Sequence, residues 1–547
     1  MKNKSFILSL LLCGIALSLE AAPRTLCSQA QGIVLYGESA PHLKTKELSQ
    51  VRGLQIIDLK LPGPIDPLKK ELYAILDAGP ITVDTISQLQ ESIKQYYADY
   101  SHPFVVVQIP KQDVTDCVLQ MDVIESHVGA VSVVGNEWFS SNLMKTFVGL
   151  KPGDEIDQAK LAQNLYFINQ DPFVQADLIF APGTTKYTTD VTIAVKERRS
   201  IRLYAGVDNT GIESVGRNRW FMGVNWGNAF GLGHLLSYQY TASFNRDQFE
   251  GITAQYQAPL TWHHILNIYG GYSRVHPHLH IPTVRNTGWS WQASLRYQIP
   301  LCVSNHLQHD FFVGGDFKRT NNTFEFSDET PTSGRTVNLT QVMAEYKGNY
   351  VNNDYALDFD GSLFYSPGSW IPDQSNADYR SLRAGAKHTW VYFRGAFSYF
   401  QKMPRDWSFY MLTRGQISSQ NLLPSEQYGI GGYDTVRGYE ERQLNKDTAV
   451  LATIEFRSPR LPVIGSWCSK CKDGIQFLAF ADYGWGTNHK ADLPTFKANY
   501  LAGVGPGIRY FYNSYLTARL DVGYKLRKKS YYNGGPAMVH FSVIGSY

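Results

Sequence analysis

After residue 22 the sequence lacks any long apolar run. A transmembrane helix needs about 20 mostly apolar residues in succession, so helical membrane spans are excluded from residue 23 onward. The sequence also lacks an excess of either sign of charge, because the formal net charge is only +3 over 547 residues. A balance so near neutral gives no argument for a nucleic-acid partner. Any membrane role of this chain therefore has to come from strands.

Motifs for enzymatic chemistry are also missing. The sequence has no glycine-rich phosphate loop, metalloprotease helix or nucleophile elbow, so we expect no catalytic site, no nucleotide and no cofactor. Three histidines alternate at His276, His278 and His280. On a strand they would share one face and could bind a metal. Pro277 and Pro282 indicate a loop tip instead, and we expect no metal site here.

Cysteine is sparse, with 6 residues in the chain. Five follow the N-terminal apolar stretch, and this odd count leaves at least one outside an internal disulfide. They are Cys27, Cys117, Cys302, Cys468 and Cys471. Cys468 and Cys471 form a CxxC in a turn-like stretch, where export permits a local disulfide. We favour that disulfide over a zinc site, because one CxxC without a second pair is weak evidence for zinc.

The N-terminus has the pattern of a secretory signal peptide. Lys2 and Lys4 give it positive charge, residues 6–19 are apolar, and two alanines follow. We expect residues 1–22 to form this signal. Cys13 offers an alternative, a lipoprotein site, which the large leucine before it disfavours.

The residues in which the chain is rich favour strands. Aromatic residues make up 13%, led by 34 Tyr and 28 Phe, and there are 46 Gly. Hydrophobic residues make up a moderate 43%. A barrel with one lipid-facing side and one wet side has such a composition. A secreted all-β protein would share it, so the order of the residues has to decide.

Residues 198–547 show strand and turn patterns throughout. Trp289, Trp291 and Leu295 fall on one face of a segment whose other face carries Arg296. The same alternation occurs over residues 236–244 and 516–525. Alternation over about ten residues matches strands that cross lipid at a tilt, with charged side chains toward the lumen. A soluble β-sandwich also alternates, but its strands are usually about 5–6 residues long.

The number of strands follows from the length of this region. About 350 residues, at roughly 22 per strand and connection, give about 16 antiparallel strands, and single-chain bacterial barrels have even numbers. The final pattern ends on the aromatic Tyr547, as a strand that closes a barrel would. We therefore predict an all-β transmembrane barrel over residues 198–547.

Residues 51–197 alternate helical and strand patterns instead. Two units of the order β-α-α-β-β follow one another, over residues 51–126 and 127–197. The predicted helices are 67–76, 83–97, 140–147 and 156–168, and the predicted strands are 54–59, 104–109, 117–124, 128–134, 174–180 and 189–195. Residues 23–50 show little periodicity, and we expect a linker there.

Two motifs carry a resemblance to a known family. Val436-Arg437-Gly438-Tyr439 resembles the lid-loop motif of the outer-membrane assembly and secretion superfamily. Phe480-Ala481-Asp482-Tyr483-Gly484 resembles the matching motif on the inner barrel wall of that superfamily. Residues 150–154 and 208–211 resemble its second POTRA module and its first barrel hairpin. The branch with two modules is that of the two-partner secretion transporters, which export haemolysins and filamentous adhesins.

The resemblance implies an architecture and a function. Two α+β POTRA modules in the periplasm would precede a barrel of about 16 strands in the bacterial outer membrane. The modules would capture a secreted partner exoprotein as an extended chain added to a strand edge. The candidate edge consists of Val174, Gln175, Ala176, Asp177, Leu178, Ile179 and Phe180, and Phe104–Ile109 is an equal candidate. The partners implied are this exoprotein and outer-membrane lipid, with no need for nucleotide.

The motif pair also has a physical interpretation of its own. Arg437 offers a planar fork of donors that matches the carboxylate of Asp482. The period of two places Phe480, Asp482 and Gly484 on one face, which has to be the lumen face because a carboxylate is costly toward lipid. At about 4 Å and an effective dielectric near 20, the pair attracts by about 4 kcal/mol before desolvation. We hypothesise a latch that an arriving substrate releases. The alternative is an ordinary turn and an unrelated strand aspartate.

Two other functions stay open at this stage. A factor that inserts other barrels would share the latch, but usually carries more POTRA modules. A passive porin or a surface adhesin would explain the barrel and leave residues 51–197 without a purpose.

Overall fold

A computed structural model of the chain describes residues 25–112, 116–277, 287–301, 303–304, 306–321, 335–465, 471–489, 498–527 and 535–547. The expected signal peptide and Cys13 lie outside these residues, as do Cys302, Cys468, His278 and His280. Within the described ranges, no helix has the length and apolarity to cross a membrane.

The first α+β module is built on a four-stranded sheet of order β2-β1-β4-β3. Its elements are β1 (Gly32–Tyr36), α1 (Thr45–Leu48), β2 (Gly53–Ile57), α2 (Ile65–Asp77), α3 (Val83–Asp99), β3 (Val105–Gln108) and β4 (Val118–Glu125). Leu72 of α2 and Ile93 of α3 are fully buried in one core with Leu35 of β1 and Met121 of β4. The two long helices therefore cover the sheet, as their apolar spacing predicts.

Residues 23–50 contribute to this module, so the expectation of a linker is wrong. Gly32–Tyr36 forms β1, which pairs in parallel with both β2 and β4. All five of its residues are buried. A strand covered on both faces is apolar throughout and shows no alternation. The period-two signal that revealed the other strands is therefore missing here.

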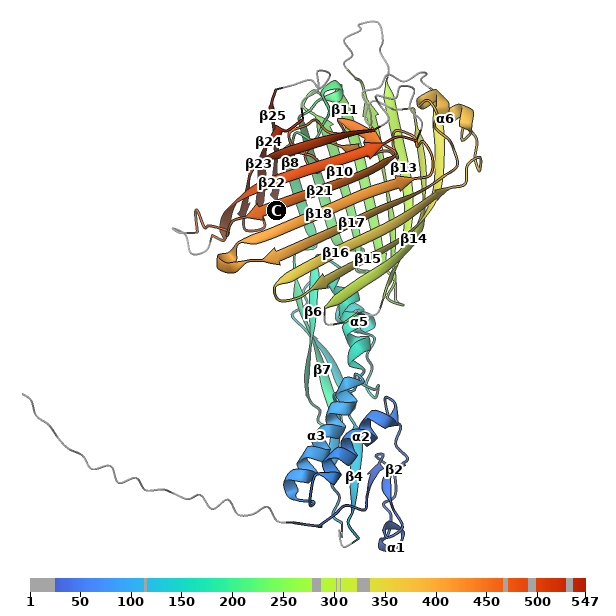
Figure 1. Ribbon diagram of the computed structural model, residues 1–547, viewed down its shortest axis with the longest axis vertical. Helices are drawn as coiled ribbons and strands as arrows, with labels where there is room; N and C mark the ends of the chain where they lie inside the picture. Colours follow the sequence, from blue (N-terminus) through green and yellow to red (C-terminus); the bar gives the residue numbers. More distant parts are fainter. Residues whose placement is uncertain are drawn as a thin grey trace, which may run out of the picture. The chain divides into compact units, whose positions relative to one another are not determined.

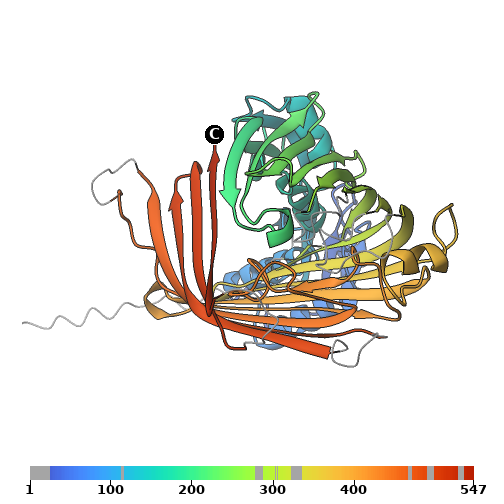
Figure 2. The same cartoon turned by 90° about the horizontal axis from the view of Figure 1, so that it is seen from above.

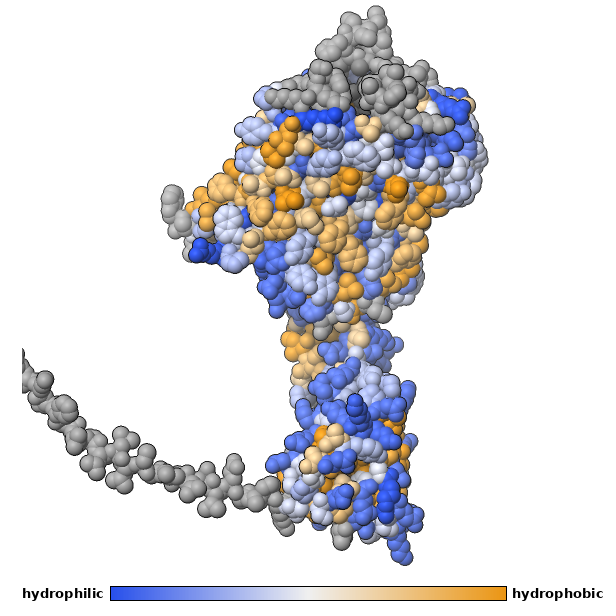
Figure 3. Space-filling view, in the orientation of Figure 1, coloured by the Kyte–Doolittle hydropathy of each residue, from blue (hydrophilic) through white to orange (hydrophobic). Residues whose placement is uncertain are grey.

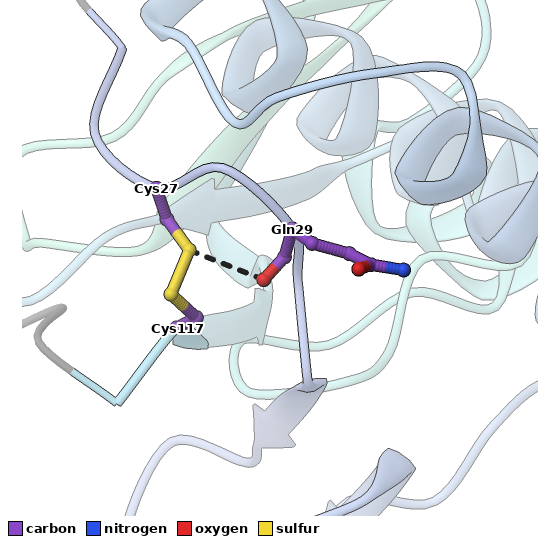
Figure 4. Close-up of a disulfide and its surroundings, with 3 residues drawn as sticks. All are labelled: Cys27, Gln29 and Cys117. Carbon is purple, nitrogen blue, oxygen red and sulfur yellow. Dashed lines mark hydrogen bonds between the residues drawn. A yellow bond between two sulfur atoms is a disulfide. The ribbon is translucent and has the colours of Figure 1, made fainter.

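A disulfide between Cys27 and Cys117 ties the chain before β1 to the chain before β4 (Figure 4). The register of these parallel strands sets Gly32 beside Val118, so the segments leading into them run side by side. The two Cα atoms are 5.8 Å apart, a separation that a disulfide spans readily. The sequence left this pairing open, because it depends on a register that spacing alone does not give.

The second α+β module has a three-stranded sheet of order β5-β7-β6. Its elements are β5 (His127–Val134), α4 (Ser141–Val148), α5 (Gln158–Asn169), β6 (Val174–Pro182) and β7 (Thr188–Glu197). Their order is the predicted β-α-α-β-β. Residues 131–151 and 159–180 form one compact unit with the barrel. The exact domain boundaries at residues 126 and 197 stay predictions.

Sixteen antiparallel strands form a closed barrel, which confirms the predicted fold class (Figures 1 and 2). They are β8 (Ile201–Asp208), β9 (Arg219–Ala229), β10 (His234–Ser243), β11 (Phe249–Pro259), β12 (Ile265–Val275), β13 (Gly288–Pro300), β14 (Leu307–Thr320), β15 (Val337–Val351), β16 (Tyr355–Ser366), β17 (Trp390–Lys402), β18 (Ser408–Ser418), β21 (Thr448–Arg457), β22 (Asp473–Thr487), β23 (Ala498–Tyr512), β24 (Leu516–Lys525) and β25 (Ala537–Ser546). The last strand, β25, pairs with β8 and closes the ring.

The two faces of the barrel wall differ as the alternation predicts. Along β13, Leu295 is 47% exposed on the outer face, whereas the neighbouring Arg296 is 7% exposed. Arg296 donates to Asp316 of β14 over 2.6 Å. Apolar side chains gather on the outer surface of the barrel strands in Figure 3. The charges therefore lie inside, and the apolar side chains form the surface that a bilayer would cover.

Side chains of the second module contact the barrel within their common unit. The hydroxyl of Tyr166 in α5 donates to Asp310 of β14 over 2.7 Å. Nε2 of His263, in the turn between β11 and β12, lies 2.7 Å from the carbonyl oxygen of Phe147 in α4. These polar contacts hold the two module helices against the ends of barrel strands.

Candidate functional site

The lid loop, residues 419–447, connects β18 to β21 and folds into the barrel lumen. It contains a short hairpin of β19 (Tyr428–Ile430) and β20 (Leu444–Lys446). Gly431, Gly432 and Gly438 have φ values of 109°, 112° and 100°. Side chains other than glycine rarely adopt such values, so these glycines permit the sharp reversal that brings the tip of the loop to the wall.

The structure brings the two motif residues Arg437 and Asp482 together. Nε and Nη2 of Arg437 each donate to one oxygen of Asp482, both over 2.8 Å, and the backbone N–H of Arg437 donates to the same carboxylate over 3.0 Å. The guanidinium carbon also lies 3.5 Å from the ring centroid of Phe480. Both charged side chains are almost fully buried. The fork geometry and the cation–π contact are those expected of a strong arginine site.

Arg437 sits in a larger ion-pair cluster that three barrel strands complete. Its Nη1 donates to Glu455 of β21 over 2.7 Å and lies 3.6 Å from Asp521 of β24. Arg509 of β23 makes a bidentate pair with Asp521, at 2.7 and 3.0 Å. The remaining members of the ion-pair cluster are Arg457, Arg519 and Asp434. Four arginines thus face four carboxylates, which compensates their charges, and all of these side chains except Asp434 are largely shielded from water.

Glycines on both sides allow the loop to touch the wall. A Cβ atom on Gly523 of β24 would overlap the backbone of Gly438. A Cβ atom on Gly484 of β22 would overlap the side chains of Ile430 and Val436. The Gly438 N–H also donates to Nε2 of His540 in β25 over 3.0 Å. Gly484, on the same face as Asp482, therefore leaves the room that the loop needs to approach the wall.

The other lid-loop motif residues are buried. Val436 is fully buried and packs with Ile430, Leu451 and Leu501. The hydroxyl of Tyr439 donates to the carbonyl oxygen of Ala502 over 3.0 Å. All four residues from Val436 to Tyr439 thus hold the loop tip against β21 to β25.

A second set of contacts fixes the base of the lid loop. Glu426 accepts from Lys318 of β14 over 2.8 Å and from Tyr392 of β17 over 2.9 Å. Asp447 accepts two hydrogen bonds from Arg383, at 2.6 and 3.0 Å. Arg383 directly follows α6 (Asn376–Leu382), in the connection between β16 and β17. The lid loop is therefore anchored on both sides of the lumen.

The candidate capture strand is an edge strand in the structure. Val174–Pro182 forms β6 at one end of the sheet order β5-β7-β6. The side chain of Asn169 hydrogen bonds to both the N–H and the carbonyl oxygen of Ala176. Ile179 is 55% exposed further along the strand. The alternative candidate, Phe104–Ile109, contains β3, which is also an edge.

The turn that leads into β6 holds a half-buried carboxylate. The Phe173 N–H donates to Asp171 over 2.8 Å. Burial, which disfavours the charged form, is stronger than this hydrogen bond and raises the pKa of Asp171 to about 6.

Two other sequence candidates fall partly outside the described residues. Cys468 lies there, so the Cys468–Cys471 disulfide stays a prediction. His278 and His280 lie there too, and among the described residues no group of three or more His, Cys, Asp or Glu is placed to hold a metal.

Sequence reasoning did not assign Glu455, Asp521, Arg509 or His540 to the site. A signal existed for Asp521, because its strand alternates and places it on the wet face with Arg519. The convergence of four strands on Arg437 depends on the barrel register, which no local pattern contains.

A lid loop held inside a sixteen-strand barrel that follows two α+β POTRA modules defines the class of outer-membrane POTRA-barrel proteins. Comparison with known proteins agrees. The family model described as haemolysin secretion/activation protein ShlB/FhaC/HecB matches residues 188–510. The chain belongs to this family, and it is an outer-membrane protein-translocating pore with its modules in the periplasm.

Individual relatives are distant in sequence, and a solved structure is similar in fold. The heme/hemopexin transporter protein HuxB of Haemophilus influenzae (strain 86-028NP) is 21% identical over 425 residues, which cover 75% of this chain and 71% of HuxB. The outer membrane transporter CdiB of Dickeya dadantii (strain 3937) is 20% identical over 478 residues, covering 84% and 80%. The solved structure of CdiB from Escherichia coli has a TM-score of 0.77 at 15% identity, covering 98% of this chain and 93% of that one.

Proposed function

We propose that this pore secretes a partner exoprotein that the second POTRA module captures as an extended chain along β6. The captured chain then crosses the outer membrane through the lumen after the lid loop has left it. The observation that carries the proposal is the position of the lid loop inside the lumen. Ion pairs and hydrogen bonds hold it there, and an incoming chain can replace such contacts.

The edge position of β6 supports the capture step. An edge strand offers backbone groups to which an extended chain can be added, with side chains such as Ile179 available for apolar contact. The side chain of Asn169 already hydrogen bonds to the backbone N–H and carbonyl oxygen of Ala176. The second half of the strand, from Asp177, therefore suits the added chain better.

The charge balance of the ion-pair cluster supports the release step. Removing Arg437 from a wall that carries Asp482 and Glu455 leaves buried carboxylates, which is costly unless water or another donor replaces the guanidinium. A chain in the lumen can supply such donors from its backbone. The outer apolar surface of the barrel contacts membrane lipid throughout this cycle.

Two lysine substitutions on opposite edges of one sheet test the capture step. Ile179 of β6 and Val134 of β5 are 55% and 48% exposed, so neither change disturbs a core. A charged side chain discourages strand addition at the edge that carries it. Each variant would complement a deletion strain of the source bacterium, and the proteins released into the medium would be quantified.

We expect Ile179→Lys to lower release of the exported protein by at least about tenfold, equivalent to about 1.4 kcal/mol. Val134→Lys should release it at the wild-type level. Equal release by both variants, at equal amounts of barrel in the outer membrane, would contradict capture at β6.

A further inference from the structure

The lumen contains an open trough of about 940 Å³ that the lid loop leaves unfilled. Its floor is the inner face of β8 to β13. Along the described part of this trough, Asp208 and Arg219 are the charged lining residues, and they oppose each other on neighbouring strands near one end. The rest of the lining is made of hydroxyl, amide, aromatic, aliphatic and small side chains and of backbone.

The strand register arranges these polar side chains in rows across the trough. Gln239 of β10 lies opposite Thr253 of β11, which lies opposite Gly271 of β12, and that lies opposite Gln292 of β13. The row ends at Lys318 of β14, where the charged part of the lumen begins. A parallel row runs from Asn225 through Ser237, Gln255, Tyr269 and Ser294 to Asp316.

Several groups in these rows also bond to one another along the inner face. Tyr204 donates to Gln239 over 3.0 Å, and Gln239 donates to Thr241 over 3.0 Å. Gln292 donates to Ser294 over 2.7 Å. The trough therefore presents rows of neutral donors and acceptors among aromatic and aliphatic side chains, whereas the opposite wall carries the ion-pair cluster and the lid loop.

We infer that this trough is the path of the exported chain and that it favours an extended segment of low charge, rich in Ser, Thr, Asn and Gly. The inference rests on the proposed function and adds the substrate class. Uncharged polar side chains find hydroxyl and amide partners in the trough. Away from the end that holds Asp208 and Arg219, a charged side chain would lose water in the trough without meeting a counter-charge, at a cost in free energy.

The size of the trough fits an extended chain. At strand dimensions of about 3.3 Å along the chain, 4.8 Å to a neighbour and 10 Å between faces, its volume accommodates about six residues. Such a segment spans much of a barrel strand, so charge would be excluded over a length of several residues at a time.

Current blockade by synthetic peptides tests the inference. The full chain carrying Arg437→Ala, which frees the lid, would be inserted in planar lipid bilayers, and Asp482→Asn provides a second way to free it. Three peptides of about 30 residues, long enough to cross the barrel when extended, would be compared. One is a Gly-Ser-Asn-Thr repeat, and the other two carry Asp or Lys in place of every Asn.

We expect the uncharged peptide to block the current at least about ten times more often than either charged peptide. Gln239→Glu and Gln292→Glu should favour the Lys peptide and disfavour the Asp peptide. Gln308→Glu, at an exposed position of β14 that does not line the trough, should leave the ranking unchanged.

The outcomes separate the two claims. Equal blockade by all three peptides, or an unchanged ranking in Gln239→Glu, overturns the inference while passage of a polypeptide still stands. A conducting pore that none of the peptides blocks overturns the proposed function, and the inference falls with it.

Discussion

Arg437 illustrates how a single side chain holds the lid loop in place. Its five N–H donors face Asp482, Glu455 and Asp521, and its planar face lies on the ring of Phe480. A lysine could not match this set, because it lacks the planar fork. Such a site is strong while complete and costly when one partner is removed, and this asymmetry suits the firm but replaceable contact that the proposed function requires.

Removing the charge of Asp482 should loosen the lid loop. Asp482→Asn keeps the size of the side chain but leaves Arg437 with fewer counter-charges, at a cost of about 3–5 kcal/mol for breaking a buried pair. We expect the amides of residues 431–439 to exchange hydrogen at least about 100-fold faster. Hydrogen-exchange mass spectrometry of the full chain in detergent measures this.

Asp406→Asn is the matched control for Asp482→Asn, since Asp406 carries an exposed carboxylate in the turn between β17 and β18, away from the lid loop. Its exchange should stay close to wild type. Unchanged exchange in both variants would show that Asp482 does not hold the lid loop.

Asp171 gives the second module a pH dependence. Its pKa in the folded chain is about 6, above the ordinary 3.8, so the folded state binds the proton more tightly than the unfolded chain does. Stability from this group is therefore greatest at low pH and declines as the pH rises from about 4 through about 6. Asp171→Asn should remove that decline.

Thermal unfolding of the full chain, followed at about pH 4.5 and about pH 7.5, measures the effect as a difference between variant and wild type. Asp177→Asn, which changes an exposed carboxylate of β6, serves as control. If the difference in unfolding temperature between Asp171→Asn and the wild type does not grow with pH, burial does not raise the pKa of Asp171.

Some site residues were predictable at this scale and others were not. Arg437, Gly438, Asp482 and Gly484 occur in the two short motifs that carry the family resemblance, and the period of two places Asp482 and Gly484 on one face. His540 offers no such cue, because a buried histidine in a strand pattern looks like any other residue of the wet face. Its contact with Gly438 joins positions 102 residues apart, and only the closed ring brings them together.

At the scale of elements, alternation over residues 236–244, 289–299 and 516–525 predicted barrel strands with one face toward lipid, and the structure has strands there. The predicted segment 289–299 lies within β13, and the predicted helix 83–97 lies within α3. The signal fails for β1, since both of its faces are covered and its residues are uniformly apolar. A strand can thus be predicted from alternation in the sequence only when one of its two faces is exposed.

The disulfide should be a major support of the first module. It closes a loop with a sequence separation of 90 residues, and losing it should destabilise the module by about 2–5 kcal/mol. We expect Cys27→Ser to lower the unfolding temperature of this module, and reduction of the wild type to have the same effect. Proteolysis of the full chain during a temperature ramp would follow it.

Cys117→Ser provides the consistency check for that prediction, since it removes the same bond from the other side. The double variant should be no less stable than either single variant. Full stability in Cys27→Ser would mean that the bond adds nothing to the module.

On the scale of the whole molecule, the lumen is divided by charge. One wall carries the ion-pair cluster and the anchored lid loop, and the wall formed by β8 to β13 carries neutral polar rows beside an open trough. The strand number was predictable from length, because about 22 residues per strand and connection is a general property of such barrels. The division of the lumen was not, since it depends on which strands become neighbours and where the lid loop lies.

The central claim is that the lid loop, held by Arg437, closes the pore until a chain displaces it. Single-channel recording of the full chain in planar bilayers tests this claim most directly, with Arg437→Ala compared with wild type. Arg405→Ala, in the exposed turn between β17 and β18, is the control. The account predicts that Arg437→Ala is open at least about tenfold more of the time, while the control matches wild type. Equal open probability in all three proteins would contradict it.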